Sequence, residues 1–581
     1  MIVRERFCNC CMTLLARPIS RDEFIRAFRL CKPLIPWPET IAIGNSGGPD
    51  STGLLFLMHR YFSENLHVSN LPRRVVSLHV DHGLQVASGD MAKRCANNAK
   101  SIGVEHHVLK VPWSKDGFPK LPTEGPLEHS ARLARYRVLF DGMTKANASI
   151  LALGHHADDQ VETSLMRIMK GSTEDGAAGM KHCRRWGMNF GYFGAGGPMD
   201  YEGMRRWIIR PLLTFPKDRL LATCEENKLS YVTDETNFQP ELTLRNALRQ
   251  WLANDGKQSE SDEHLLNISI LRKKLAALDI DIDPSGGVGQ IRSAVNALSL
   301  QADDIDHEVD FMLSRNALRS PPGTYLITHR SLASIENPKV QRAIILRILR
   351  YASFHPWGSL AAQVNRRTNS LSQIVNKLWG GNPFEEQIRP FCAGGGVSWT
   401  PVAISGDKFR FIDRGSNGNI NFRNSETFGW LASRQNPPSH ETMSGRGFTN
   451  PLRIDITSRI ILKLDSRDTA PLEVLYDNRF IVTMNLASMP SDIEKSIRNP
   501  ANQIWLLSQT RWFWPKVVLK SQNQEDIILH SSAQSPKTLV LFHNLNPSEV
   551  EQWKQIYWRP FGKEIVAPWI EVDFMRPLTT M

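Results

Sequence analysis

Hydrophobic and polar positions along residues 40–250 predict short strands that alternate with helices. Apolar runs rich in Val and Ile are typical of buried strands, and each is followed by a longer stretch with helical spacing. The expected strands cover 41–44, 74–80, 105–111, 149–154, 206–210 and 229–232, and the expected helices end near 62 or cover 88–102, 128–140 and 157–169. This order predicts an α/β fold, with a parallel sheet that carries helices on both of its faces.

The pattern changes after about residue 250. Helical spacing recurs over 261–278, 290–318, 340–351 and 370–378, and glycine-rich turns at 380–381 and 394–396 then precede expected strands at 452–456, 480–483 and 538–542. We therefore expect four parts: an N-terminal extension (1–39), an α/β domain (40–250), a helical module (251–380) and a mixed α/β or β-rich C-terminal region (381–581).

Composition narrows the class of protein. A chain of 581 residues is long enough for two to four domains, and 41% hydrophobic with 22% charged residues is typical of a folded protein. No run of about 18 apolar residues occurs, which excludes a membrane-spanning helix. Lys and Arg number 70 and Asp and Glu 59, an excess of 11 positive charges that suits a polyanionic partner.

The cysteines and the N-terminus indicate an intracellular protein. Of the eight cysteines, Cys8, Cys10 and Cys11 form a cluster, but no second pair follows at the spacing of a zinc site. We expect all of them to be reduced thiols. Residues 1–39 combine six arginines with four acidic residues, which is a weak match to a mitochondrial presequence.

The segment Ser46-Gly47-Gly48-Pro49-Asp50-Ser51 lies between the first expected strand and its helix. Two glycines let the main chain approach a ligand, and the start of a helix directs N–H groups at an anion. The Lys-Ser/Thr pair of a Walker loop is absent. We predict a phosphate cradle, with Asp50 meeting a metal that arrives with the nucleotide. The alternative is a structural strand-to-helix turn.

A second polar segment follows the strand predicted at 149–154. It contains His155 and His156 and then three acids, Asp158, Asp159 and Glu162, spaced so that Glu162 shares a helix face with each aspartate. Acids in the first turn of a helix favour the helix dipole, so capping is the structural interpretation. Histidines beside carboxylates also suit Mg²⁺ binding or proton transfer.

Two pairs of arginines lie at helical spacing. Arg132 and Arg135 are three residues apart, and Arg245 and Arg249 are four apart. A solvated basic face is the usual explanation of such pairs. Contact with the phosphates of RNA is the functional alternative.

Together these segments resemble the tRNA(Ile)-lysidine synthetase family, which belongs to the PP-loop ATP-pyrophosphatase superfamily with a Rossmann-like sheet. The resemblance rests on Ser46–Ser51, Val80-Asp-His-Gly-Leu84, Ala131–Tyr136, Gly154–Thr163, Ala178-Gly-Met180, Arg210-Pro-Leu-Leu213 and Arg245–Arg249, in that order. It covers about residues 40–250. Two residues depart from the family pattern: Asn45 stands where a valine is more common, and Gln85 where an arginine is common.

The resemblance implies ATP and Mg²⁺ as cofactors, and an isoleucine tRNA with a CAU anticodon and free L-lysine as partners. ATP would adenylate the wobble cytidine at C2, and lysine would then displace AMP to give lysidine. Loop residues 46–51 would hold pyrophosphate, and Asp50 with Asp158 or Asp159 would hold Mg²⁺. His155, His156 or Glu162 would take the lysine proton, and the four arginines would contact tRNA.

Three questions stay open from the sequence. A PP-loop thiolase would transfer sulfur to a tRNA base, but Cys95, Cys183 and Cys224 are isolated and form no Cys-x-x-Cys pair. A catalytically inactive tRNA-binding relative is disfavoured, because the acidic residues of both motifs are all present: Asp50, Asp158, Asp159 and Glu162. Lysidine belongs to bacterial-type decoding, so a eukaryotic member should act in an organelle. The divergent tail, the weakly basic N-terminus and the pI near 9.2 favour a fungal-type mitochondrial protein, with a cytoplasmic location as the alternative.

Overall fold

The computed structural model describes most of the chain, in two compact units. The described residues are 16–84, 88–115, 118–121, 127–172, 174–188, 199–232, 244–253, 287–359, 362, 368–380, 388–406, 408–412, 422–423, 425–436, 452–466, 468–509, 511–522, 525–531 and 565–578. One unit comprises residues 1–184 and 208–300, and the other comprises 185–207 and 301–581. Each unit is described below by itself.

A six-stranded sheet forms the centre of the first unit. Its last two strands include the residues at which the two units are divided. Its strands are β1 (Thr40–Gly44), β2 (Arg74–Asp81), β3 (Glu105–Lys110), β4 (Ile150–Leu153), β5 (Cys183–Arg185) and β6 (Trp207–Ile209). They lie in the order β3-β2-β1-β4-β6-β5, and β1 is parallel to β2 and β4, as β2 is to β3. The order reverses between β1 and β4, so the carboxyl ends of these two strands flank a position where α/β sheets bind ligands.

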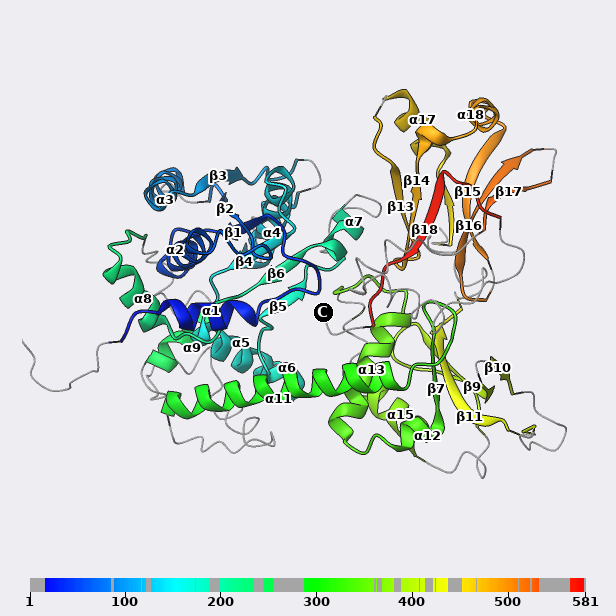
Figure 1. Cartoon of the computed structure of the whole chain (residues 1–581), viewed down its shortest axis with the longest axis horizontal. Helices are drawn as coiled ribbons and strands as arrows, with labels where there is room; N and C mark the ends of the chain where they lie inside the picture. Colours follow the sequence, from blue (N-terminus) through cyan, green and yellow to red (C-terminus); the bar gives the residue numbers. More distant parts are fainter. Residues whose placement is uncertain are drawn as a thin grey trace, which may run out of the picture. The chain divides into compact units, whose positions relative to one another are not determined.

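Helices cover both faces of this sheet (Figure 1). They are α1 (Arg21–Arg29), α2 (Pro49–Glu64), α3 (Ser88–Ile102), α4 (Leu127–Lys145), α5 (Ala157–Met169), α6 (Glu174–Ala177), α8 (Lys217–Glu226) and α9 (Leu244–Ala253). Helices α2 and α3 pack against β2, and α4 packs against β2 and β3 from the opposite face, as right-handed crossovers require. Both sheet faces are therefore buried, and Ile41, Ile43 and Leu151 are fully inaccessible.

The second unit is built on antiparallel sheets. Helices α12 (His329–Ala333), α13 (Pro338–Ala352) and α15 (Thr368–Trp379) accompany a sheet of β7 (Tyr325–Thr328), β8 (Phe391–Cys392), β9 (Val397–Ser405), β10 (Lys408–Phe411) and β11 (Thr427–Arg434). The short helix α7 (Met199–Glu202) also belongs to this unit. The long helix α11 (Gly287–Arg315) contributes residues to both units. Helices α12 and α13 pack on β11, and Trp399 and Trp430 are buried in the core they share.

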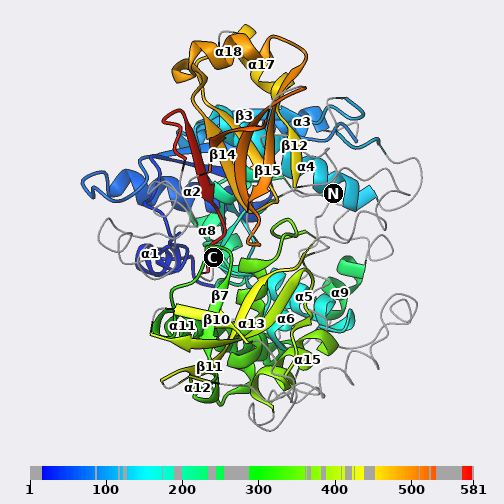
Figure 2. The same cartoon turned by 90° about the vertical axis from the view of Figure 1, so that its right-hand side faces the viewer.

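Two further antiparallel sheets follow in the same unit. One consists of β12 (Arg453–Asp455), β15 (Asn502–Gln509), β16 (Trp514–Ser521) and β17 (Ile527–His530), and the other of β13 (Leu472–Tyr476), β14 (Phe480–Met484) and β18 (Ile570–Phe574). Figure 2 shows α17 (Thr457–Asp465) and α18 (Ser491–Ile497) at one end of these sheets. The sheets share a core that includes Phe480, Trp514 and Phe574.

The expected α/β fold, with helical and β-rich parts after it, is confirmed. The helix predicted at 157–169 has those bounds, and the helices expected at 290–318, 340–351 and 370–378 correspond to α11, α13 and α15. The strand predicted at 229–232 is wrong, because this segment pairs with none of the described strands; the Val232 N–H instead donates to the Gly47 carbonyl at 2.8 Å. The helix predicted at 261–278 and the strand at 538–542 lie outside the described residues. No helix in the described ranges is long and apolar enough to cross a membrane.

Candidate active site

The loop of residues 46–51 leaves β1 and enters α2 in a conformation that only glycine adopts easily. Gly47 has φ = +86°, and a Cβ there would lie 2.5 Å from the Cys95 sulfur. Gly48 is the N-cap of α2 and Pro49 occupies its first turn. Because a glycine cap has no side chain to accept the first N–H groups of the helix, these donors point at the place where an anion would bind.

A second glycine brings the two predicted motifs together. Gly154 follows β4, and a Cβ on it would lie 3.0 Å from the carbonyl carbon and oxygen of Asp50 and 3.1 Å from the Ser51 nitrogen. No larger residue fits without displacing the start of α2. The close approach places the histidines after β4 beside the phosphate loop.

The first turn of α5 is capped, as the structural interpretation predicts. The Asp159 carboxylate accepts the His156 N–H at 3.0 Å, and His156 Nδ1 accepts the Asp158 N–H at 3.2 Å. The same imidazole also faces the loop, since its Nε2 lies 3.7 Å from Asp50 Oδ2 and 3.5 Å from Asp159 Oδ2. His156 therefore both caps the helix and lies between two carboxylates, and it is only 3% exposed.

Asp50 is the least satisfied carboxylate of the site. Burial raises its pKa, while nearby His156 and Lys217 partly offset that effect. The Lys217 Nζ lies 3.8 Å from Asp50 Oδ2, and Asp50 Oδ1 is buried with no hydrogen-bond partner among the described residues. An unpartnered buried oxygen is costly unless a ligand completes it. Lys217 was not predicted, because no local pattern connects it to Asp50.

The two other aspartates are already engaged. Asp158 accepts the Lys217 backbone N–H at 2.9 Å on one oxygen and an arginine, Arg292, on the other. Asp159 accepts the His156 N–H on one oxygen and the Arg245 guanidinium, at 2.9 Å, on the other. The described residues include no cluster of three or more His, Cys, Asp or Glu side chains arranged as a metal site.

The donors that are present nevertheless fit Mg²⁺. This ion commonly takes one or two carboxylates together with the phosphates of its nucleotide and water. Asp50 would supply the carboxylate through Oδ1. Asp158 and Asp159 would have to release their present donors in order to join it.

Arg245 and Arg249 form ion pairs with the acids of α5. The Nε atoms of Arg245 and Arg249 each lie 2.6 Å from an oxygen of Glu162, and both guanidinium groups also reach Asp159 Oδ1. Burial opposes ionisation of Asp159, but His156, His155 and Arg245 lower its pKa overall. The predicted contact of these arginines with tRNA stays a prediction, and it would have to compete with these ion pairs.

His155 has a different environment. Burial, reinforced by the nearby Arg210, lowers its pKa to about 3, so its imidazole is neutral near pH 7. Its Nδ1 is buried without a hydrogen-bond partner in the part of the chain that the structure describes. Arg210 is 4% exposed and donates to the Lys181 carbonyl at 2.9 Å. A neutral imidazole next to a fixed cation can accept a hydrogen bond from a substrate, but its low pKa makes it a weak base.

Arg132 and Arg135 lie on α4. The Arg132 guanidinium lies 5.1 Å from the centre of the Tyr136 ring, and its Nη2 lies 3.4 Å from the Tyr136 hydroxyl. Burial alone would raise the pKa of Tyr136, but Arg132, Arg184 and Arg210 lower it. Arg135 reaches His82, after the end of β2, at 3.4 Å. These arginines therefore lie among other cations, which is an environment suited to an anion.

The cysteines of this unit are nearer the loop than their isolated sequence positions indicate. The Cys95 sulfur packs behind Gly47, and the Cys224 sulfur lies 3.6 Å from the Pro49 carbonyl oxygen. Burial raises the pKa of Cys95 to about 11 and that of Cys224 to about 12. Both are therefore neutral thiols rather than the thiolates that act as nucleophiles.

The sheet order, the glycine-bearing loop and the acids at the neighbouring strand end define a PP-loop protein. A family model described as a PP-loop domain matches residues 24–255. The tRNA(Ile)-lysidine synthase of Rhodopseudomonas palustris is 30% identical over 295 residues, which is 48% of this chain and 76% of that protein. The chain belongs to the tRNA(Ile)-lysidine synthase family.

Other relatives differ in how much of their length is matched. The tRNA(Ile)-lysidine synthase of Methylobacterium nodulans is 29% identical over 391 residues, 66% of this chain and 91% of that protein. The enzyme of the same name from Bacillus subtilis is 35% identical over 230 residues, 39% of this chain but only 42% of that protein. The chain thus aligns with less than half of the Bacillus subtilis protein.

Proposed function

We propose that this protein ligates free L-lysine to C2 of the wobble cytidine of an isoleucine tRNA with a CAU anticodon, and consumes ATP to give AMP and pyrophosphate. The observation that carries the proposal is the contact between the two motifs. Asp50 of the phosphate loop and His156 of the second motif lie 3.7 Å apart, at adjacent strand ends of a chain that belongs to the lysidine synthase family.

In the first step the C2 oxygen of cytidine attacks the α-phosphate of ATP and pyrophosphate leaves. Backbone N–H groups at the start of α2 would hold the leaving group, as helix N-termini hold phosphates. Asp50 Oδ1 would hold Mg²⁺, which offsets charge on the phosphates when it is bound. Lys217, 3.8 Å from Asp50, would add a positive charge at the same place.

In the second step the ε-amine of lysine attacks C2 and AMP leaves. The attacking nitrogen must lose a proton, and the candidates stay His155, His156 and Glu162. Glu162 is disfavoured, because both of its oxygens accept from arginines. His155 Nδ1 has no partner among the residues described, but its pKa of about 3 makes this imidazole a weak base. A general base must lie within hydrogen-bond reach of the proton that it takes.

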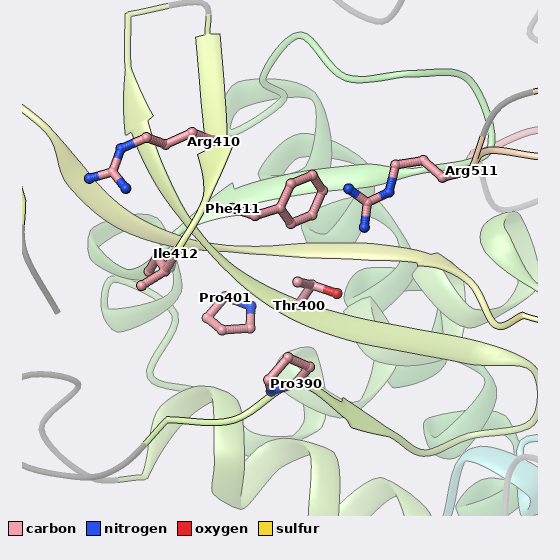
Figure 3. A pocket seen from close by; sticks show the side chains of 7 residues that line it. All are labelled: Pro390, Thr400, Pro401, Arg410, Phe411, Ile412 and Arg511. Atoms are coloured by element: carbon pink, nitrogen blue, oxygen red, sulfur yellow. The ribbon is translucent and has the colours of Figure 1, made fainter. Parts of the chain in front are cut away.

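We also propose that the region 381–581 contributes to tRNA binding. A pocket of about 550 Å³ in the second unit is lined on its apolar side by Pro390, Pro401 and Ile412 (Figure 3). Arg511 points toward the Phe411 ring, with its guanidinium carbon 3.7 Å from the ring centre. Stacked arginines suit phosphates and bases of RNA, because the planar fork stays available at its edges.

The proposal is tested by withholding lysine. With ATP labelled at the α-phosphate, the protein should attach the label to tRNA(Ile) and release pyrophosphate. Addition of lysine should then release the label as AMP. Release of labelled AMP without any tRNA-bound intermediate would contradict the two-step mechanism, and product formed with a sulfur donor but no lysine would identify a thiolase instead.

The mitochondrial location is likewise a proposal. It rests on the divergent tail, the weakly basic N-terminus and the pI near 9.2, and residues 1–15 lie outside the described part of the chain. A fluorescent fusion to the complete N-terminus should co-localise with mitochondria, whereas diffuse fluorescence would favour the cytoplasmic alternative.

A further inference from the structure

The phosphate loop is tied to the neighbouring strand by one buried side chain. Asn45 stands between β1 and the loop and is 2% exposed. Its Oδ1 lies 2.9 Å from the Gly47 nitrogen and 3.1 Å from the Ser51 hydroxyl, and its Nδ2 lies 3.1 Å from the Ser77 hydroxyl on β2. The residue therefore joins the loop to the sheet through its amide group.

The orientation of this amide follows from its partners. A backbone N–H is only a donor, so the Asn45 atom that faces Gly47 must be the carbonyl oxygen. The NH₂ group then faces Ser77 and donates to it. Asn45 is also held through its own main chain, whose N–H donates to the Leu78 carbonyl at 2.8 Å and whose carbonyl lies 2.9 Å from His79 Nδ1.

The hydrogen bonds continue in both directions from Asn45. On the loop side, the Ser51 hydroxyl accepts the Ser46 N–H at 3.2 Å and lies 3.2 Å from the Ser46 hydroxyl. On the sheet side, the Ser77 hydroxyl lies 2.9 Å from His106 Nδ1 on β3. Burial lowers the pKa of His106 to about 4, so near pH 7 this imidazole is neutral and Nδ1 can accept the Ser77 proton.

These bonds can all run in one direction. In that direction Ser46 donates to Ser51, Ser51 to Asn45, Asn45 to Ser77 and Ser77 to His106, so that every hydroxyl would both donate and accept. The Gly48 carbonyl, 3.1 Å from the Ser51 hydroxyl, is a second acceptor that competes with Asn45 for the Ser51 proton. Chains of this kind strengthen each bond in a low-dielectric interior and fix the groups at their ends. Here one end is the pair of loop serines and the other is a buried imidazole on β3.

We propose that Asn45 is a positioning residue for the pyrophosphate half of ATP, acting through the Ser46–Ser51–Asn45–Ser77–His106 chain. The inference rests on the proposed use of ATP and deepens it. By accepting the Gly47 N–H, Asn45 holds the glycine in its left-handed conformation. By accepting from Ser51, it orients both loop hydroxyls.

The test measures binding of the two halves of the nucleotide separately. Asn45→Leu keeps the number and branching of the side-chain heavy atoms but removes both polar groups. Its affinity for magnesium pyrophosphate, measured by titration calorimetry on the full chain, should fall about tenfold, as expected for the removal of one or two hydrogen bonds. Its affinity for AMP, which lacks the β- and γ-phosphates, should change less than about twofold.

Two companion variants separate positioning from stability. Ser77→Ala interrupts the series of hydrogen bonds on the sheet side. Its effect on pyrophosphate affinity should not add to that of Asn45→Leu in the double variant, because both substitutions act through the same series of hydrogen bonds. Thr223→Val is a matched control, since it removes a buried hydroxyl that accepts from the Ile19 N–H at 2.9 Å in the same unit. It should lower the melting temperature without changing pyrophosphate affinity.

Several outcomes would overturn the inference. They are unchanged pyrophosphate binding in Asn45→Leu, an equal loss of AMP and pyrophosphate affinity, or additive effects of Asn45→Leu and Ser77→Ala. If Asn45→Leu does not fold, Ser77→Ala alone decides, and an unchanged pyrophosphate affinity then contradicts the proposal. The binding assay needs no tRNA or lysine, so it stands even if lysidine is not the product.

Discussion

Each unit contains a group of arginines paired with buried carboxylates, and the two groups differ in how completely their polar atoms have partners. In the second unit, Asp477 accepts from Arg434 at 2.7 and 2.8 Å and from Arg479 at 2.8 Å, and all three side chains are at most 2% exposed. The Arg434 guanidinium also lies between the Phe354 and Phe513 rings, at 4.4 and 4.5 Å. The two guanidinium groups thus share the one carboxylate of Asp477, and every member of this Asp477 group has a charged partner within the protein itself.

The group in the first unit is organised differently. Asp159 and Glu162 are paired with Arg245 and Arg249, but these arginine side chains are 26% and 35% exposed, and Asp50 Oδ1 next to them lacks a partner among the described residues. Ion pairing alone therefore does not mark a functional site. Partly exposed charged groups and a carboxylate oxygen without a partner do mark a functional site, because a ligand can supply the missing contacts.

The largest effect expected from this difference is on stability. Asp477→Asn should lower the free energy of unfolding of the second unit by about 3–5 kcal/mol, because it leaves two buried guanidinium groups without a countercharge. Denaturant unfolding measures the change. Asp468→Asn is the control: Asp468 is half exposed in its pair with Lys463, so this substitution should cost far less, as is usual for surface ion pairs. Equal losses in the two variants would remove the distinction.

The next effect is on catalysis. Asp50→Asn should reduce AMP production about 100- to 1,000-fold while circular dichroism stays unchanged, because the metal and the transferred phosphate lose their carboxylate. Asp158→Asn should be milder, since both Asp158 oxygens already accept from protein donors. If Asp158→Asn were as severe in a folded protein, Asp158 would be the metal ligand that the structure does not favour.

A smaller effect concerns tRNA binding. Removal of one arginine that binds a phosphate should reduce the slope of log affinity against log salt by about 0.7–0.9. Arg132→Ala combined with Arg135→Ala should therefore reduce the slope by about 1.4–1.8, and Arg511→Ala by about half as much. Arg498→Ala, which removes an arginine paired with Asp465 and Glu494, is the control. An unchanged slope together with reduced stability would return these arginines to a structural role.

The smallest predicted effect is a pH dependence of stability. His155 has a folded-state pKa of about 3, against an unfolded value near 6.5. Between these two pH values the imidazole is protonated in the unfolded chain but not in the folded protein. The free energy of unfolding therefore falls as the pH is lowered from about 6.5. His155→Gln cannot bind that proton and should lose about 1.5 kcal/mol less than the native protein between about pH 6.5 and 5. Parallel stability curves would contradict the neutral imidazole.

Local patterns predicted the sheet and its first motifs well. The strand ending at Gly44, the loop after it and the helix beginning at Ala157 each have an apolar run and a turn or cap signal within a few residues. The strand expected at 229–232 failed because a β-branched residue and a tyrosine satisfy the local pattern, whereas pairing depends on a neighbour that sequence does not reveal. β7 in the expected helical module was missed for the same reason.

The partners of the site residues were harder to predict. Lys217 and Arg292 lie far along the chain from Asp50 and Asp158, and nothing in their own neighbourhoods indicates a contact. Cys95 and Cys224 likewise come to lie behind the loop only through folding. Asn45 gave one signal, its departure from the family pattern, but the hydrogen bonds that explain this departure involve Ser77 on another strand.

The proposed ligation of lysine to tRNA is tested most directly by identifying the product of the reaction. The protein should be incubated with ATP, Mg²⁺, unmodified tRNA(Ile) bearing a CAU anticodon and lysine labelled with heavy isotopes, and the tRNA should then be digested to nucleosides for mass spectrometry. We expect one modified cytidine per tRNA that carries the mass of the labelled lysine, and none when ATP or lysine is omitted. Unmodified cytidine in the complete reaction, with tRNA binding intact, would contradict the proposed function.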